Sequence, residues 1–144
     1  MALDDHHKHF AGNVAQKAVI EKDGKVLVVL PPGEETWDLP GGRLHVGEVP
    51  LEGLRREIAE ELGLDIKVHE VFFADMWMPS HVEPDKARYF VAFACSLINP
   101  SASFVFEKEE IADAKWIGKD EVDSLPLYEI CKNALKAYFK NLEL

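Results

Sequence analysis

Cysteine and long apolar runs are both scarce in this sequence. Its 144 residues include two cysteines, Cys95 and Cys131, whose positions fit neither a metal-binding nor a redox motif, so we expect buried free thiols. No apolar run approaches the roughly 20 residues that span a membrane. Residues 1–10 also lack the basic start and apolar core of a secretory signal. We therefore expect a cytoplasmic protein that does not enter a membrane.

Basic residues are outnumbered as well: 16 Lys and Arg stand against 26 Asp and Glu, for a formal net charge of −10. A general nucleic-acid binder usually presents a basic patch to the phosphate backbone, so the composition disfavours that class. A small phosphate-bearing ligand would instead need a bound cation and local basic side chains. Arg43 is a candidate for such a contact, although an ion pair with one of the many acids fits it equally well.

The composition is typical of one compact domain. Hydrophobic residues make up 47% of the chain, and neither a repeat nor a low-complexity segment interrupts it. We expect residues 13–144 to form a single domain and residues 1–12 to be a flexible terminus. The cluster His6, His7 and His9 lies in this terminus and is assigned no role.

Apolar periodicity predicts a mixture of strands and helices. A turn at Asp23–Gly24 between two apolar runs indicates a hairpin. The segment from Leu127 to Tyr138 keeps helical spacing and predicts a helix that packs on a sheet. Residues 76–86 are interpreted as a loop placed to contact the variable part of a substrate. The strands are expected at residues 14–20, 26–30, 66–74, 88–97 and 114–117, with a short strand that leads into Pro40.

The most informative stretch runs from Gly42 to Leu64 and is rich in glutamate. Glu57, Glu60 and Glu61 stand at i, i+3 and i+4, so a helix would stack their carboxylates on one face. Hard divalent cations prefer such oxygen ligands, together with water and substrate phosphates. The pattern therefore predicts a half-built Mg²⁺ or Mn²⁺ site. A solvated acidic face is the competing interpretation of the helix taken alone.

The same helix is expected to carry an ion pair and an apolar stripe. Arg56 precedes Glu60 by one turn, which predicts an ion pair that orients a metal-binding carboxylate. Gly53 is expected to leave room beneath the metal, and Gly63 suits the C-terminal stop. The stripe that should anchor the helix to a sheet comprises Leu51, Leu54, Ile58 and Leu62.

Nine positions of this stretch resemble the signature of the MutT/Nudix hydrolase family with no gap. The upstream run from Trp37 to Gly42 is also similar to the Pro-Gly-Gly turn that leads into that signature. The resemblance implies an α/β fold of the Nudix type, an α/β/α sandwich around a mixed β-sheet. The nine positions are Gly42, Glu48, Arg56, Glu57, Ile58, Glu60, Glu61, Gly63 and Leu64.

The resemblance further implies a hydrolase that needs Mg²⁺ or Mn²⁺ and cleaves the pyrophosphate linkage of a nucleoside diphosphate derivative by attack of water on phosphorus. The substrate would be a small nucleotide, such as a nucleoside triphosphate, a nucleotide sugar or ADP-ribose. Arg56 and Glu110 join the three helical glutamates as expected catalytic residues, with Glu110 as a base from a downstream loop. Gly41, Gly42 and Arg43 are expected to bind substrate. The expected metal ligands are Gly42, Glu48, Glu57, Glu60 and Glu61.

Several alternatives stay open at this level. The acidic run 107–110 fits an exposed loop as well as it fits a catalytic base. A non-catalytic nucleotide sensor on the same fold is the alternative function, although the intact carboxylates and the lack of a basic helix pair speak against it. Pro79 is similar to a proline of ADP-ribose-type members, but one loop proline does not assign the leaving group. Because many relatives dimerise, the resemblance also favours a homodimer.

Overall fold

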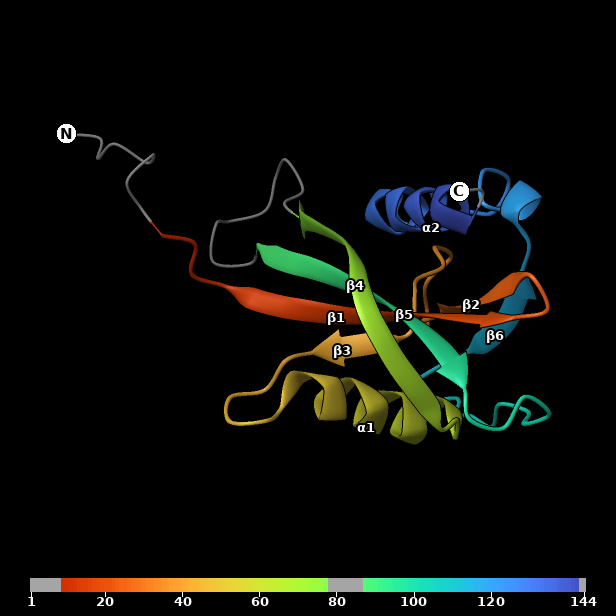
Figure 1. Cartoon of the computed structure of the whole chain (residues 1–144), viewed down its shortest axis with the longest axis horizontal. Helices are drawn as coiled ribbons and strands as arrows, with labels where there is room; N and C mark the ends of the chain where they lie inside the picture. The colour runs from red at the N-terminus through yellow and green to blue at the C-terminus, as the bar shows by residue number, and fades with distance from the viewer. Residues whose placement is uncertain (1–8, 78–86, 143–144) are drawn as a thin grey trace.

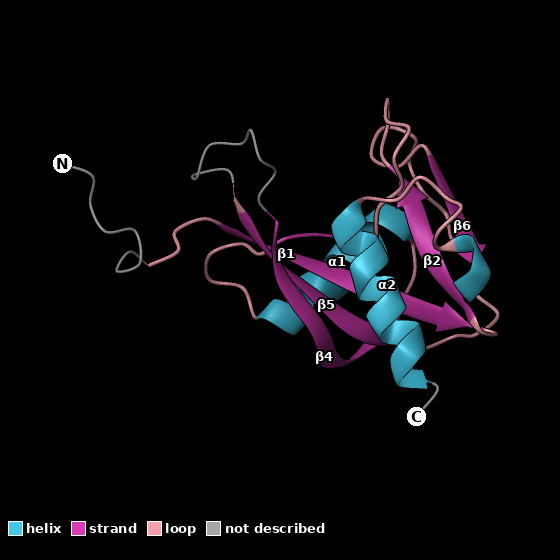
Figure 2. Ribbon diagram, turned by 90° about the horizontal axis from the view of Figure 1, so that it is seen from above, coloured by secondary structure: helices cyan, strands magenta, loops and turns pink. Residues whose placement is uncertain are grey.

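The computed structural model describes residues 9–77 and 87–142. Figures 1 and 2 show a sheet covered by helix α1 on one side and by helix α2 on the other, which confirms the predicted α/β/α sandwich. None of the described helices is long and apolar enough to cross a membrane. The elements in chain order are β1 (Asn13–Lys22), β2 (Lys25–Leu30), β3 (Gly41–Arg43), α1 (Pro50–Leu62), β4 (Ile66–Trp77), β5 (Arg88–Leu97), β6 (Asp113–Ile117), the 3-10 helix η3 (Lys119–Glu121) and α2 (Glu129–Leu142).

Six strands of the described residues form one mixed sheet in the order β4-β5-β1-β2-β6, with β3 beside β1. β1 and β5 run parallel, and the other pairs are antiparallel. Along its other edge β1 changes partner: residues 15–17 pair with β3, whereas residues 21–22 pair with β2. Between them, the Ala18 N–H donates to the Pro40 carbonyl at 2.9 Å. This branching brings β3 and α1 together at one end of the sheet.

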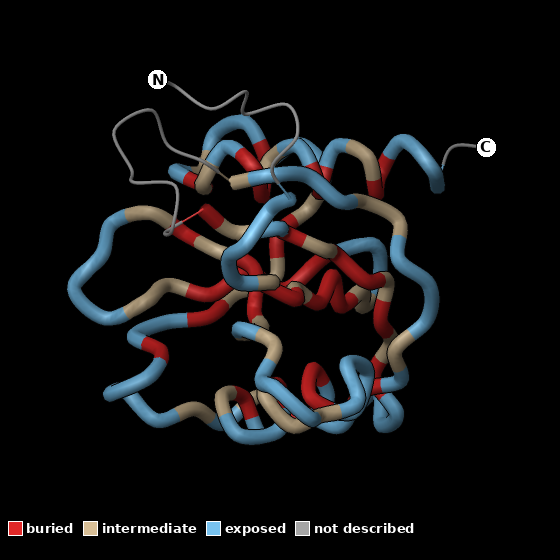
Figure 3. Tube along the Cα trace, turned by 90° about the vertical axis from the view of Figure 1, so that its left-hand side faces the viewer, coloured by how far each residue is buried: buried red, intermediate tan, exposed pale blue. Residues whose placement is uncertain are grey.

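Successive side chains along each strand point to opposite faces of the sheet, so the core is divided into two layers. On β1, Ala18 and Ile20 belong to the layer beneath α1, and Val19 belongs to the layer beneath α2. Figure 3 shows the buried residues gathered along the strands between the two helices. Cys95 lies in the α1 layer and Cys131 in the α2 layer, and burial raises the pKa of both thiols. The prediction of buried, free cysteines is confirmed.

Helix α1 begins and ends where its sequence predicts. Pro50 occupies the first turn, and Gly63 caps the C-terminus with a φ of 65° while its N–H donates to the Ala59 carbonyl at 2.9 Å. Leu51 departs from the predicted apolar stripe: it lies in the first turn and is 42% exposed, because the buried face of α1 begins only after it. The buried side chains of the stripe are Leu54, Ile58 and Leu62.

The predicted strand at residues 88–97 is confirmed with the same bounds as β5. The predicted loop at residues 76–86 is wrong at its start, because Met76 and Trp77 continue β4 by pairing with the first residues of β5. The rest of that loop, including Pro79, lies outside the described residues.

The short strand predicted to lead into Pro40 does not form within the described residues. Trp37 and Asp38 make isolated bridges instead, to Leu127 and Val29 respectively, and β3 follows the proline. Trp37 is 8% exposed and packs in the α2 layer, so this segment is fixed by burial as well as by backbone hydrogen bonds. The segment that joins β2 to β3 therefore lies against the α2 layer of the core.

Gly41 is a position where the fold should not tolerate a side chain. Its φ is +146°, and an added Cβ would collide with the carbonyl oxygen of Gln16 on β1. We expect Gly41→Ala to lower the free energy of unfolding by at least about 2 kcal/mol in urea titrations, because β3 must shift away from β1. Gly24→Ala is the control: φ is also positive, at +79°, but no atom lies within 4 Å, so about 1 kcal/mol is expected. Equal losses would contradict the close-contact argument.

Candidate active site

Two glycines let carboxylates approach the backbone closely. A Cβ on Gly42 would lie 2.7 Å from Cδ of Glu57, and a Cβ on Gly53 would lie 2.6 Å from Cδ of Glu48. Both distances are too short for a side chain unless the glutamates move. The room predicted beneath a metal at Gly53 is therefore occupied by the Glu48 carboxylate. Glu57 packs in the same way against β3.

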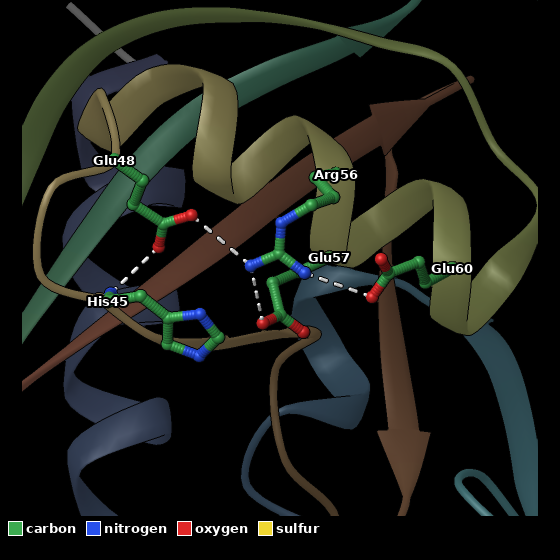
Figure 4. Close-up of polar contacts among 5 residues, drawn as sticks. All are labelled: His45, Glu48, Arg56, Glu57 and Glu60. Atoms are coloured by element: carbon green, nitrogen blue, oxygen red, sulfur yellow. Dashed lines mark hydrogen bonds and ion pairs between the residues drawn. The ribbon is translucent and has the colours of Figure 1, made fainter.

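Arg56 holds three of these glutamates together, as Figure 4 shows. Its Nη1 donates to Glu60 Oε2 at 3.0 Å, which is the predicted one-turn ion pair. Its Nη2 donates to Glu48 Oε2 at 3.3 Å and to Glu57 Oε1 at 3.2 Å. The bond to Glu60, with the contacts to the other two acids, raises the pKa of Arg56 above its ordinary value. One guanidinium thus fixes the relative positions of three carboxylates.

Glu48 also ties the loop before α1 to this cluster. Its Oε1 accepts the backbone N–H of His45 at 2.8 Å while its Oε2 accepts the bond from Arg56 (Figure 4). The His45 N–H is the largest of the effects that lower the pKa of Glu48. The loop is thereby held against α1 through one side chain, although its residue Val46 is fully exposed.

Glu61 lies beside Glu57, and the negative charge of Glu57 disfavours the ionised form of Glu61. Burial, together with the charge of Glu57 and a hydrogen bond between the two side chains, raises the pKa of Glu61 to about 7. The positive charge of Lys17 and the backbone N–H of Gly41 act in the opposite direction. At neutral pH the Glu61 carboxyl is therefore protonated in part, unless a cation offsets the negative charge around it.

A divalent cation fits the Glu57–Glu61 pair better than it fits the full set of signature glutamates. No three His, Cys, Asp or Glu side chains of the described segments converge closely enough to hold an ion as they stand. Glu60 differs from the expected three-carboxylate face, because its side chain is 57% exposed and turned to Arg56. Glu57 and Glu61 are adjacent and partly buried, and even with Arg56 beside Glu57 and the charge of Lys17 acting on Glu61, burial and the Glu57 charge keep the pKa of Glu61 raised. Two such carboxylates offer the oxygen ligands that Mg²⁺ and Mn²⁺ prefer.

A pocket of about 390 Å³ opens on the α2 side of the sheet and meets the carboxylates at Gly42, which lines the pocket and contacts Glu57. Phe90, Ile130 and Cys131, all from the α2 layer of the core, form its apolar wall. Its charged and hydroxyl-bearing lining residues are Lys17, Glu34, Asp38, Arg43, Arg88 and Tyr128.

Lys17 links the pocket to the carboxylate pair. Its Nζ donates to Asp38 Oδ2 at 3.2 Å and to the Leu39 carbonyl at 3.1 Å, and the side chain is only 15% exposed. The same charge lowers the pKa of Glu61, so Lys17 acts on both sides of β3. The Lys17 ammonium group thus places a positive charge between the carboxylate pair and the pocket.

The family model described as the NUDIX domain matches residues 13–138, which is most of the chain. The chain belongs to the Nudix family. Nudix proteins generally use divalent metals, in keeping with the Glu57–Glu61 pair.

Two relatives and one solved structure illustrate the likeness. A MutT-like protein of Streptomyces ambofaciens is 32% identical over 106 residues, which cover 72% of this chain but 62% of that protein. The nucleoside triphosphatase NudI of Enterobacter sp. (strain 638) is 30% identical over 105 residues, or 68% of this chain and 71% of the relative. The crystal structure of a UDP-X diphosphatase aligns with a TM-score of 0.76 and 27% identity over 97% of this chain and 67% of that one. The chain thus spans less than two thirds of the MutT-like protein.

Of the predicted site residues, Arg56 joins Glu48, Glu57 and Glu60, and Glu61 lies beside Glu57. The backbone N–H of Gly41 bonds to Glu61, and Gly42 and Arg43 line the pocket. Glu110 does not line it: the side chain is exposed, in a turn where the Glu110 N–H donates to the Glu107 carbonyl at 3.0 Å. Its role as a base stays a prediction, as do the metal ligands and the homodimer.

Sequence reasoning missed the pocket residues Lys17, Asp38, Arg88 and Tyr128. They come from four separate segments, so no spacing marks them. A signal exists for Lys17, which interrupts the apolar pattern of a central strand and stands between Ala15 and Val19 on the face toward α2. A charged residue at such a position indicates a buried partner or a ligand.

The raised pKa of Glu61 predicts how the metal-free protein responds to pH. The folded-state value of about 7 lies above the ordinary 4.5, so the protonated form stabilises the fold. This contribution is complete below about pH 4.5 and is lost as the pH rises through 7. With chelator present, we expect Glu61→Gln to be about 1–2 kcal/mol more stable than the parent at pH 8 and equal to it at pH 4.5, as the carboxyl is partly exposed.

The matched control is Glu52→Gln, an exposed glutamate in the first turn of the same helix, which should follow the parent at every pH. Urea titrations at several pH values, each with and without Mg²⁺, provide the measurement. A difference between parent and Glu61→Gln that does not vary with pH would contradict the assigned shift.

Proposed function

We propose that this Nudix protein is a hydrolase that requires Mg²⁺ or Mn²⁺ and cleaves the pyrophosphate linkage of a nucleoside diphosphate derivative. The observation that carries the proposal is the Glu57–Glu61 pair, which is held against the glycine turn where the pocket begins. Two neighbouring carboxylates need a cation, and the adjoining pocket has the size of a small-molecule site.

Each residue has a defined task in this proposal. Glu57 and Glu61 hold the cation, with the Gly42 carbonyl, Glu48 and Glu60 as further candidate ligands. Arg56 is a positioning residue, since its bonds to Glu48, Glu57 and Glu60 set where the carboxylates stand. When bound, the cation neutralises charge on the pyrophosphate oxygens and lowers the pKa of water.

The reaction is attack of water on phosphorus. The new phosphorus–oxygen bond forms as the bridging phosphorus–oxygen bond breaks, and the bridging oxygen leaves with the second phosphate. A carboxylate takes the proton of the attacking water. A glutamate of the signature helix, such as Glu61, and Glu110 are the two candidates for this base. The product that identifies the reaction is a nucleoside monophosphate.

The relatives support a small nucleotide as the substrate. NudI is named a nucleoside triphosphatase, and the structural relative is named a UDP-X diphosphatase. Both names describe nucleotides with a pyrophosphate linkage. The net charge of −10 disfavours general nucleic-acid binding by this chain, so we propose a free nucleotide rather than a polymer.

The test is product analysis across nucleoside triphosphates, nucleotide sugars, ADP-ribose and dinucleoside polyphosphates, with Mg²⁺, with Mn²⁺ and with chelator. We expect chelator-sensitive release of a nucleoside monophosphate from at least one class. Glu57→Gln and Glu61→Gln should lower kcat at least about 100-fold with the fold retained, because each removes a charge that acts at the reacting centre.

Glu52→Gln is again the control, and its kcat should stay within about twofold of the parent. Hydrolysis that persists in chelator, or a fully active Glu61→Gln, would refute the proposal. Nucleotide binding by a well-folded parent without turnover of any substrate would favour a sensor instead.

A further inference from the structure

The pocket beside the signature has more positive than negative charge, in contrast to the chain as a whole. Three cations line it, namely Lys17, Arg43 and Arg88, and two carboxylates, Glu34 and Asp38. The protein around it has a formal net charge of −10. A local surplus of positive charge in an acidic protein calls for an anionic partner.

Both pocket carboxylates are already engaged by neighbours. Asp38 Oδ2 accepts a hydrogen bond from Lys17 Nζ at 3.2 Å, and Asp38 Oδ1 accepts one from the Leu39 N–H at 2.7 Å. Glu34 Oε2 accepts the Tyr128 hydroxyl at 2.8 Å; burial and this bond raise the pKa of Tyr128 to about 12. Neither carboxylate pairs with an arginine of the pocket.

Arg43 and Arg88 therefore carry the surplus. Neither has an ion-pair partner among residues 9–77 and 87–142. The Nε atom of Arg88 is buried and finds no acceptor in this part of the chain. A buried N–H without a partner carries a desolvation cost that an acceptor from a ligand would remove.

Trp77 sets the position of Arg88. The guanidinium carbon of Arg88 lies 5.5 Å from the centre of the Trp77 ring, and the two residues pair across β4 and β5. This cation–π contact holds the guanidinium over the ring and leaves its N–H groups to donate to a ligand. Such a preset fork matches the oxygens of a phosphate or a carboxylate.

We propose that this pocket binds a second anionic group of the substrate, a phosphate or carboxylate that lies beyond the pyrophosphate linkage, and that Arg88 and Arg43 are its ligands. The inference rests on the proposed function and narrows it: the preferred substrates carry one anionic group more than the pyrophosphate itself. Gly42 is shared by the pocket and the carboxylate pair, so one small molecule can occupy both.

Two matched pairs of substrates test the proposal and separate the two anion types. UDP-glucuronate differs from UDP-glucose by a carboxylate, and ATP differs from ADP by a phosphate. We expect kcat/KM to be roughly tenfold higher for at least one anionic member than for its partner, the size of one charge-assisted hydrogen bond. The pair that shows the preference identifies the anion.

Variants assign the preference to the pocket. Arg88→Gln and Arg43→Gln should each reduce the ratio of kcat/KM within that pair to about 2 or less, mainly through KM for the anionic member. Arg43 is exposed, so its substitution tests the idea even if Arg88→Gln folds poorly. The control is Arg55→Gln, which removes an equal charge from an exposed surface pair with Asp65 at 3.0 Å and should leave the ratio unchanged.

A binding measurement in chelator checks the pocket without turnover. The dissociation constant of the preferred member should rise roughly tenfold in Arg88→Gln or Arg43→Gln, while that of its partner without the additional anionic group stays near the parental value. Equal kcat/KM within both pairs, or a preference that survives both substitutions, would overturn the inference and leave the proposed hydrolase intact. A lack of hydrolysis throughout would instead overturn the proposed function.

Discussion

The close packing of β3 between β1 and α1, at Gly41 and Gly42, is the constraint on which the site depends. A side chain at Gly41 would collide with the Gln16 carbonyl of β1, and one at Gly42 would have to push the Glu57 carboxylate of α1 aside. Packing of α1 in turn buries Glu61 beside Glu57 and creates the repulsion on which the proposed cation site depends. Steric fit therefore comes first, and the electrostatics of the site are its result.

Much of the site could be predicted because it is encoded locally. The helix, its caps, the Arg56–Glu60 pair and the Gly42–Glu57 neighbourhood all arise within one stretch whose spacing maps directly onto geometry. For Glu60 the sequence predicted the ion pair with Arg56, and the structure shows that this pair leaves the side chain 57% exposed. Its role as a metal ligand stays a prediction.

The pocket could not be predicted in this way, because it is assembled by the order of the strands. Lys17, Asp38, Arg88 and Tyr128 meet only once β1 has paired with β5 and the segment before β3 has packed against α2. No spacing of residues within the sequence predicts those contacts. The fold class itself came from the family resemblance, since alternation alone gives strands without their order.

The parallel pairing of β1 with β5 has a consequence for how the chain reaches this structure. Asn13 pairs with Arg88, so about half of the chain separates two residues that are neighbours in the sheet. Closing so long a segment is entropically unfavourable, and proteins dominated by such distant contacts fold slowly. During synthesis β1 must wait for β5, so the sheet beneath α1 is complete only after the whole of α1 has been made. A helix of 13 residues is marginal without tertiary packing, so α1 and the pocket both depend on this late pairing.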